Sequence, residues 1–263
     1  MLIKITKSCA NGCSHCMNDS KSCNEHMTKE TFIDVLNFCL KYDNNPTGNI
    51  ITGGEPTEHP NFIEFINLYY EIFPKTSFLT VATNGHWIAE HQLEVSELLD
   101  KYLFLAFQVT YDTRYYPKKL DTTKRIFRNK RVILIDEVEN IYPQGRAVIN
   151  KITPSPKYSY SKCINITLIT AQAFKYGLAE IISLLRKANK LCTPTINYDG
   201  GIGFGESDLC LVQCSIYNDE KTILEKMLFN ECKRCPFTEP SLQVVSTIAY
   251  GREQWKGENN AEN

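Results

Sequence analysis

Short apolar runs recur along the first two thirds of the chain, and stretches with helical spacing of apolar residues lie between them. The runs are Leu2–Ile5, Asn49–Thr52, Phe78–Ala82, Leu103–Val109, Val132–Ile135 and Ile164–Ile169. Most of them are apolar at consecutive positions, which is typical of strands in a parallel sheet that is covered on both faces. The pattern therefore predicts six buried parallel strands.

Three other stretches favour amphipathic helices, because each places its apolar residues on one face. The first begins after Thr28, a good N-cap residue, and the second begins near Pro60, which suits a first helical turn. The three apolar faces comprise Phe32, Val35, Leu36 and Cys39; Phe62, Phe65, Ile66 and Tyr69; and Leu178, Ile181, Ile182 and Leu185. Strands that alternate with helices form right-handed βα units, so we expect an α/β fold with a barrel or a doubly wound sheet. Six strands fit a partial (β/α)6 barrel.

The pattern changes past residue 190, where short segments with glycine and cysteine replace the regular alternation. The sequence Asp199-Gly200-Gly201 marks a hairpin turn there. We therefore expect residues 1–190 to form the partial barrel and residues 191–240 to form a small cysteine-rich subdomain. Residues 241–263 are predicted to be a C-terminal tail.

The composition of the 263 residues excludes several classes of protein. Hydrophobic residues make up 43% and charged residues 22%, which is typical of a globular protein. The formal net charge of −1 argues against a protein that coats nucleic acid, and no apolar run reaches the ~18 residues of a membrane span. The chain has 11 cysteines and no signal peptide, so we expect thiols in a reducing cytoplasm rather than disulfides.

The candidate chemistry begins at a loop directly after the first strand, which carries Cys9, Cys13 and Cys16. Three thiolates can hold three irons of a four-iron cluster, and the fourth iron then has no cysteine within this loop. Such an open iron can bind a substrate or a cofactor. The alternative is a zinc knuckle, because the three cysteines and His15 would make a Cys₃His set.

Polar or glycine-rich segments follow the next three strands. They are Gly53-Gly54-Glu55-Pro56 after the second strand, Thr83 and Asn84 at the end of the third, and Gln108 and Thr110 at the end of the fourth. In barrels and doubly wound sheets, the working residues lie at the carboxyl ends of the strands. We therefore expect these segments to share one edge with the cysteine loop.

The cysteine loop, Cys9-x₃-Cys13-x₂-Cys16, followed by the Gly53–Pro56 sequence, resembles the radical S-adenosylmethionine (radical SAM) superfamily. One departure is His15, because this family usually has an aromatic residue before the third cysteine. An imidazole can still stack against an adenine. The resemblance implies a 4Fe-4S cluster on the three cysteines and S-adenosylmethionine as the cofactor.

The resemblance also implies roles for individual residues. In the family, the amino and carboxylate groups of S-adenosylmethionine chelate the open iron, and one electron cleaves the cofactor to a 5′-deoxyadenosyl radical that abstracts hydrogen from the substrate. The Gly53–Pro56 turn would bind the methionine amino group, with Glu55 as the partner of the ammonium. Further candidates for contacts to the carboxylate and ribose of the cofactor are Thr83, Asn84, Gln108 and Thr110, and Arg146 is a candidate for a contact to the cofactor or the substrate.

A second metal signal lies in the C-terminal half. Four cysteines in two pairs can ligate an iron–sulfur cluster or zinc, and they are Cys192, Cys210, Cys232 and Cys235. The spacing of Cys192, Gly205 and Cys210 resembles the signature of the twitch subdomain of radical SAM enzymes, in which four thiolates hold an auxiliary cluster. Cys214 is a reserve ligand. Zinc, or a purely structural role, is the alternative.

An auxiliary cluster would favour oxidation, because a substrate radical can lose a second electron to it. The leading hypothesis is a radical SAM oxidoreductase that modifies a ribosomal peptide or a small alcohol such as a cyclitol. The alternatives are a glycyl-radical activase or another non-oxidative radical SAM enzyme, and a zinc-binding structural module.

The expected partners are the substrate and an electron donor such as flavodoxin or ferredoxin, without nucleic acid or membrane. A basic stretch from Lys118 to Arg131 fits either a solvated helix face or a docking patch for an acidic electron donor or an anionic substrate.

Overall fold

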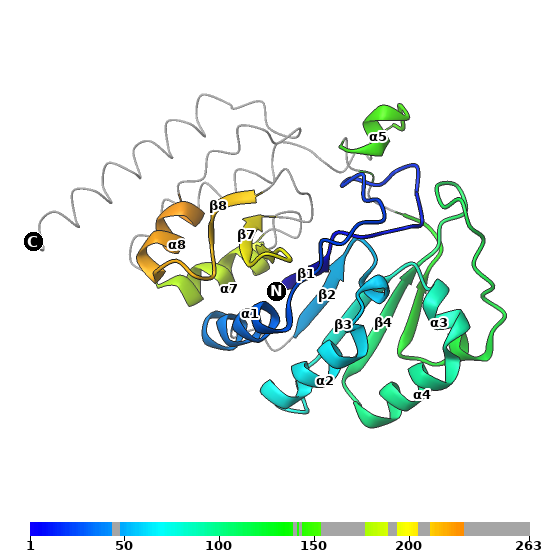
Figure 1. Ribbon diagram of the computed structural model, residues 1–263, viewed down its shortest axis with the longest axis horizontal. Coiled ribbons are helices and arrows are strands. Elements are labelled where there is room, and N and C mark those ends of the chain that lie inside the picture. The colour runs from blue at the N-terminus through cyan, green and yellow to red at the C-terminus, as the bar shows by residue number, and fades with distance from the viewer. Residues whose placement is uncertain are drawn as a thin grey trace, which may run out of the picture.

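The computed structural model describes residues 1–43, 48–138, 141, 144–153, 177–188, 194–204 and 211–228 (Figure 1). Several predicted features lie outside these ranges. They are the sixth strand at Ile164–Ile169, Gly205, the four cysteines Cys192, Cys210, Cys232 and Cys235, and the tail of residues 241–263.

The described strands form one sheet in the order β5-β4-β3-β2-β1-β6-β7-β8. Strands β1 to β5 pair in parallel, and they comprise Leu2–Thr6, Asn49–Gly53, Leu79–Thr83, Leu105–Thr110 and Val132–Ile135. Their bounds agree with five of the predicted runs to within two residues. The α/β fold with a mostly parallel sheet is thus confirmed, whereas the closure into a partial (β/α)6 barrel stays a prediction, since it needs the sixth run.

The segment past residue 190 continues the same sheet beyond β1. Strand β6 (Pro194–Ile196) pairs in parallel with β1, and the antiparallel strands β7 (Gly201–Phe204) and β8 (Leu211–Ser215) follow. The predicted hairpin turn joins β6 to β7, and Gly200 adopts φ +81°, which glycine tolerates best. The division into two domains at residue 190 stays a prediction.

Helix α1 (Lys29–Tyr42) begins where its sequence predicts. The Thr28 side chain accepts a hydrogen bond of 3.1 Å from the Thr31 N–H, which makes Thr28 the N-cap. Helix α2 (Phe62–Ile72) begins two residues after Pro60, because a short 3₁₀ helix η1 (Pro56–Glu58) lies just ahead of it. The predicted helix near Leu178 is α7 (Leu178–Ala188).

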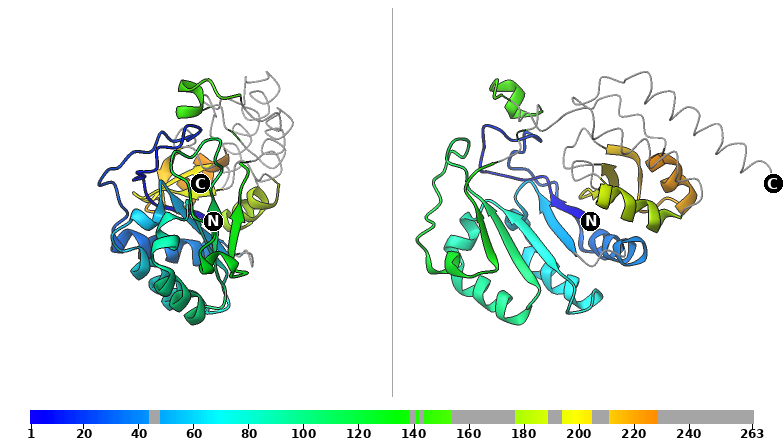
Figure 2. Two further views of the ribbon diagram at one scale, coloured as in Figure 1. Left: turned by 90° about the vertical axis from the view of Figure 1, so that its right-hand side faces the viewer. Right: turned by 180° about the vertical axis from the view of Figure 1, so that it is seen from behind.

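The remaining helices each follow a strand of the sheet along the chain. They are α3 (His86–Glu90), α4 (Gln92–Lys101), the 3₁₀ helix η2 (Arg125–Arg128), α5 (Arg146–Ile149) and α8 (Glu220–Leu228). Figure 2 shows from two further sides that helices α1 to α4 lie on one side of strands β1 to β5. None of the described helices is long and apolar enough to span a bilayer.

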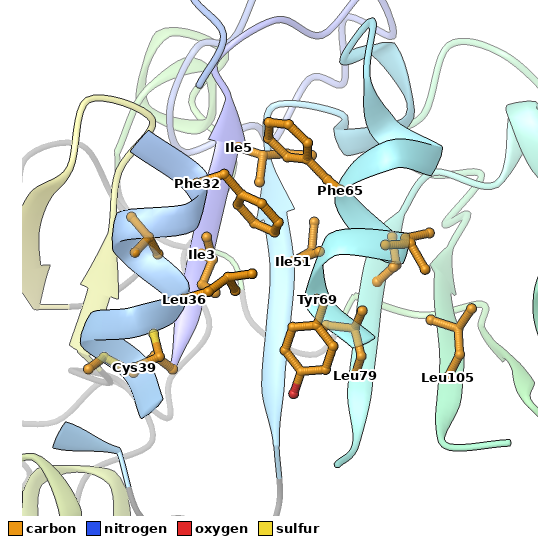
Figure 3. Packing of buried hydrophobic residues seen from close by; sticks show 14 of the residues in the cluster. Ile3, Ile5, Phe32, Leu36, Cys39, Ile51, Phe65, Tyr69, Leu79 and Leu105 are labelled. Atoms are coloured by element: carbon orange, nitrogen blue, oxygen red, sulfur yellow. The ribbon is translucent and has the colours of Figure 1, made fainter. Parts of the chain in front are cut away.

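The core lies between these helices and the sheet. The rings of Phe32 in α1 and Phe65 in α2 stack with centroids 4.1 Å apart, above the fully buried Ile3 and Ile51 (Figure 3). Burying such a side chain contributes about 1.5–3 kcal/mol. The apolar faces predicted for α1 and α2 are therefore the ones that hold the helices to the sheet.

We expect Leu36→Ala to lower the free energy of unfolding by about 2–5 kcal/mol, because Leu36 is fully buried in α1 and its loss leaves a cavity. The matched control is Leu93→Ala in α4, where the leucine is 82% exposed, with an expected change below about 0.5 kcal/mol. Urea denaturation of both variants measures the difference. Equal effects of the two substitutions would contradict the packing described here.

Candidate functional site

A cavity of about 670 Å³ lies at the carboxyl ends of strands β1 to β5. It is lined by most of the site residues predicted for the first half of the chain, namely Cys9, Cys13, Cys16, Gly53, Gly54, Glu55, Thr83, Asn84, Gln108, Thr110 and Arg146. Pro56 is not part of the lining, since it is buried at the start of η1. The structure thus brings the three cysteines and the strand ends together around one space.

The cavity extends along the face of the sheet that helices α1 to α4 leave uncovered. Side chains on a strand alternate between the two faces, so Ile51 and Val81 enter the core while Thr52 and Ala82 line the cavity. Gln108 and Thr110 lie two residues apart on β4 and therefore share the cavity face.

Glu58 ties the cysteine loop to the turn after β2. Its carboxylate accepts hydrogen bonds from the Ser8 hydroxyl at 2.9 Å and from the Ala10 N–H at 2.7 Å. Hydrogen bonds to a charged group are stronger than those between neutral groups. Sequence reasoning missed Glu58, and its only signal was its place in the turn that begins with Gly53 and Gly54.

The glycine pair allows the turn after β2 to touch the backbone that leads into the cysteine loop. A Cβ atom on Gly54 would lie 2.2 Å from the Ser8 carbonyl oxygen, and one on Gly53 would lie 2.2 Å from that of Thr6. The N–H groups of Gly54 and Glu55 donate to the Thr6 and Ser8 carbonyls at 2.8 and 2.7 Å. Only glycine permits this approach, because both oxygens belong to the backbone.

Glu55 is 3% exposed, and burial raises the pKa of its carboxyl. One carboxylate oxygen accepts bonds from the Thr57 N–H, the Thr57 hydroxyl and the Thr83 hydroxyl, at 3.2, 2.7 and 2.6 Å. The other accepts the Asn84 N–H at 2.7 Å. Glu55 therefore joins the turn after β2 to the end of β3, and its role toward a cofactor ammonium stays a prediction.

Arg146 holds the cysteine loop from the opposite side. Its Nε donates to the Cys13 carbonyl at 2.8 Å, its Nη1 donates to Asp19 and to the Ser20 carbonyl at 3.2 and 3.0 Å, and its N–H donates to the Cys16 carbonyl at 2.8 Å. Among the described residues, its Nη2 is buried without a partner, and the residue lines the cavity. Arg146 therefore fixes the loop and keeps one donor available for a ligand.

The thiols of Cys9 and Cys13 keep their protons because they are buried. Burial raises the pKa of Cys9 to about 12 and that of Cys13 to about 11, and Asn11 donates a hydrogen bond of 3.1 Å to the Cys13 sulfur. A metal must displace these protons, because the thiolate is the ligand.

The donor set fits an iron–sulfur cluster better than zinc. Among the described residues, no three His, Cys, Asp or Glu side chains converge closely enough to hold a single metal ion. A zinc site needs its donors about 2.0–2.3 Å from one ion. A four-iron cluster takes each thiolate on a separate iron, so the cysteines need only surround it.

His15 lies against two tyrosines on the wall of the cavity. Its ring centroid is 5.0 Å from that of Tyr115 and 5.5 Å from that of Tyr116, and burial lowers its pKa. Tyr116 also lines the cavity, although sequence reasoning did not single it out. The position before the third cysteine thus takes part in an aromatic cluster.

The turn that presents the two tyrosines depends on Asp112. Its carbonyl accepts the N–H groups of Tyr115 and Tyr116, at 3.1 and 3.0 Å. Its side chain is 1% exposed and accepts the Arg114 Nε–H at 2.9 Å and the Val138 N–H at 2.8 Å. Hydrogen bonding by Arg114 lowers the pKa of Asp112 to about 2, so its carboxylate is charged throughout the physiological range.

Residues 3–141 match the family model of the radical SAM superfamily. The chain is a member of that superfamily. The family implies an enzyme that uses S-adenosylmethionine and a 4Fe-4S cluster, which agrees with three cysteines around a cavity at the strand ends. A comparison with curated proteins finds no match.

Solved structures of similar proteins include two that contain AdoMet, which is S-adenosylmethionine. BtrN in complex with AdoMet and 2-DOIA is 14% identical, with a TM-score of 0.55 over 98% of this chain and 88% of that one. Native anSMEcpe with bound AdoMet and the Cp18Cys peptide is 14% identical, with a TM-score of 0.42 over 100% of this chain and 99% of that one. The likeness to BtrN agrees with the α/β fold of the described residues.

The cysteines of the predicted auxiliary site lie outside the described residues, apart from the reserve ligand Cys214. Cys214 is a half-buried free thiol on β8 that packs against the core, and burial raises its pKa to about 11. The auxiliary cluster of this radical SAM protein stays a prediction.

We expect Asp112→Asn to lower the free energy of unfolding by about 1–3 kcal/mol at pH 7, because charged hydrogen bonds at a buried position are lost. Because the pKa of Asp112 is lower in the folded protein, its carboxylate stabilises the folded state at pH values above the ordinary pKa of an aspartate. This stabilisation disappears as the pH falls toward 2. The difference between variant and wild type should therefore shrink below pH 4. Urea denaturation at several pH values measures it.

The control for this substitution is Asp100→Asn, at an exposed position of α4. It should change the free energy of unfolding by less than about 0.5 kcal/mol at both pH 7 and pH 3. A difference between Asp112→Asn and wild type that is the same at pH 7 and pH 3 would contradict the role given to the Asp112 carboxylate.

Proposed function

We propose that this radical SAM protein oxidises a small alcohol, such as a cyclitol, by abstracting hydrogen from an unactivated C–H bond. The observation that carries the proposal is the meeting of three cysteine thiols, the glycine turn and the ends of β3 and β4 around one cavity. Such a bond is beyond the acid or base chemistry of side chains. When bound, the 4Fe-4S cluster and S-adenosylmethionine supply the 5′-deoxyadenosyl radical that breaks it.

The residues of this chain position the two groups and their surroundings. Cys9, Cys13 and Cys16 would hold the cluster, while Glu58 and Arg146 keep the loop in place. The Gly53–Pro56 turn and the strand ends would bind the cofactor, in line with the family resemblance. Candidates for contacts to the cofactor or the substrate are Thr83, Asn84, Gln108, Thr110 and the unpaired Nη2 of Arg146.

The substrate class rests on one observation. BtrN, whose fold is similar over 98% of this chain, holds AdoMet together with 2-DOIA in its crystal structure. This likeness favours a small molecule over a ribosomal peptide or the glycyl-radical site of a protein partner.

The oxidation needs an acceptor for a second electron. We propose that Cys192, Cys210, Cys232 and Cys235 hold an auxiliary iron–sulfur cluster in a twitch-like subdomain, with Cys214 in reserve. We also propose that the protein works in a reducing cytoplasm with a small electron carrier as its partner.

We expect the anaerobically reconstituted wild type to release 5′-deoxyadenosine from S-adenosylmethionine with dithionite, even without substrate. The variant in which Cys9, Cys13 and Cys16 are all alanine should release none, since these cysteines hold the cluster. Its iron content should fall from about eight to about four per chain, because the auxiliary site is retained. Chromatography of the product and iron analysis measure the two quantities.

The matched control is Cys39→Ala, which removes a thiol that is buried in the core, away from the loop. It should leave both the product and the iron content unchanged. A wild type that contains zinc instead of iron, or that releases no 5′-deoxyadenosine, would contradict the proposal. About four irons per chain in the wild type would contradict the auxiliary cluster and favour the activase. Consumption of a peptide rather than a cyclitol would favour the peptide class.

A further inference from the structure

The basic stretch from Lys118 to Arg131 does not form one patch. Helix η2 carries Arg125 and Arg128, packs against α4 and immediately precedes β5, so these two arginines lie toward the amino ends of the parallel strands. Lys118 follows the turn at the carboxyl end of β4. Burial lowers the pKa of His86 at the start of α3, and the nearby charge of Lys118 lowers it further. Lys118 therefore lies at the same edge as the cysteine loop.

The outer side of the cysteine loop is flanked by two segments that Ser14 connects. The Ser14 N–H donates to the Tyr115 carbonyl at 2.9 Å, and the Ser14 carbonyl accepts a hydrogen bond of 2.8 Å from the Asn150 side chain. Lys118 lies two residues after Tyr116, so their Cα atoms are within about 7.6 Å of each other. The turn after β4 and the end of α5 thus border the loop on either side (Figure 1).

These two segments expose apolar and basic side chains without partners. Val148 and Ile149 of α5 are 57% and 68% exposed. The exposed ammonium groups of Lys118, Lys119 and Lys151 make no hydrogen bond or ion pair within the described part of the chain. We call these five residues the loop-flanking surface.

The other charges near the cysteine loop are largely paired. Arg114 binds the Asp112 carboxylate and lies near Glu137, and Asp19 binds both Lys21 and Arg146. The formal net charge of the chain is −1, so the whole molecule does not attract an acidic protein. Any attraction must come from the local unpaired lysines, which act over about 10 Å at 0.1 M salt.

We infer that the loop-flanking surface docks a small acidic electron-carrier protein that reduces the cluster held by Cys9, Cys13 and Cys16. This inference rests on the proposed function, which needs one electron from outside. One electron passes from the reduced carrier to the cluster, so the carrier is oxidised by one electron and the cluster is reduced by one. No bond forms or breaks and no proton moves in this step.

The composition of the surface suits such a partner. Unpaired lysines at its rim would steer an acidic carrier and set the salt dependence of association. Val148 and Ile149 supply apolar contact, which protein interfaces need. Because Ser14 of the cysteine loop is hydrogen-bonded to both flanking segments, a carrier seated here would approach the loop closely. The arginines of η2 are separated from the loop by the length of the strands.

The test compares the double charge reversal Lys118→Glu/Lys119→Glu with the matched control Arg125→Glu/Arg128→Glu, using the reconstituted protein and a purified bacterial flavodoxin in its fully reduced form. The two variants change the net charge equally and belong to the same basic stretch. Binding of flavodoxin is measured by calorimetry at low salt, and release of 5′-deoxyadenosine is measured with flavodoxin and, separately, with dithionite.

We expect the lysine variant to bind flavodoxin at least about tenfold more weakly at low salt and to lose flavodoxin-driven product in proportion, with the difference from wild type shrinking as salt is added, because salt screens the attraction that the wild-type lysines supply. Its dithionite-driven product should stay within about twofold of wild type, and the arginine control should match wild type in all three measurements. Equal binding by the lysine variant and wild type, or an equal loss in the arginine control, would overturn the inference. Absence of product with dithionite in the wild type would instead overturn the proposed function, while the binding comparison would still decide the docking surface.

Discussion

The candidate site depends on backbone contact between the turn after β2 and the segment that leads from β1 into the cysteine loop. Thr6 pairs with Gly53 at the end of the β1–β2 ladder, where the register shifts, and the next residues continue the contact through Gly54 and Ser8. No side chain fits between the two backbones. Two carboxylates of the same turn accept hydrogen bonds from its neighbours: Glu58 from the cysteine loop and Glu55 from the end of β3. Three strand ends are thereby fixed to one another before any ligand binds.

Several polar groups in and around the cavity are left without partners. Among the described residues, Asn11 Oδ1, His15 Nδ1 and Arg146 Nη2 are buried and unsatisfied. Each such group costs about 1–3 kcal/mol, and natural proteins retain costs of this kind at functional sites. The rest of the structure supports this arrangement with a well-packed core around Phe32 and Phe65.

The sequence predicted the parallel strands and the gathering of polar residues at their carboxyl ends because both follow from local pattern. Apolar runs at Leu2, Asn49 and Val132 mark strands wherever they occur, and polar residues at the carboxyl ends of parallel strands must gather at one edge. The carboxylate of Glu58 could not be foreseen in this way, because its partners Ser8 and Ala10 are set by tertiary contact. The same holds for Tyr116, whose place on the cavity wall depends on the turn at Asp112. The basic stretch from Lys118 to Arg131 reads as one feature along the chain, yet the sheet separates its two ends.

The most direct test for an open iron at this site is electron paramagnetic resonance of the dithionite-reduced, reconstituted protein. Spectra are compared with and without S-adenosylmethionine that is labelled with ¹⁵N at its amino group. The prediction is a reduced four-iron signal that changes on addition of the cofactor, shows hyperfine coupling to the label, and is missing when Cys9, Cys13 and Cys16 are replaced by alanine. A spectrum in which no four-iron signal responds to the cofactor, or in which the cofactor-responsive signal persists without the three cysteines, would contradict it.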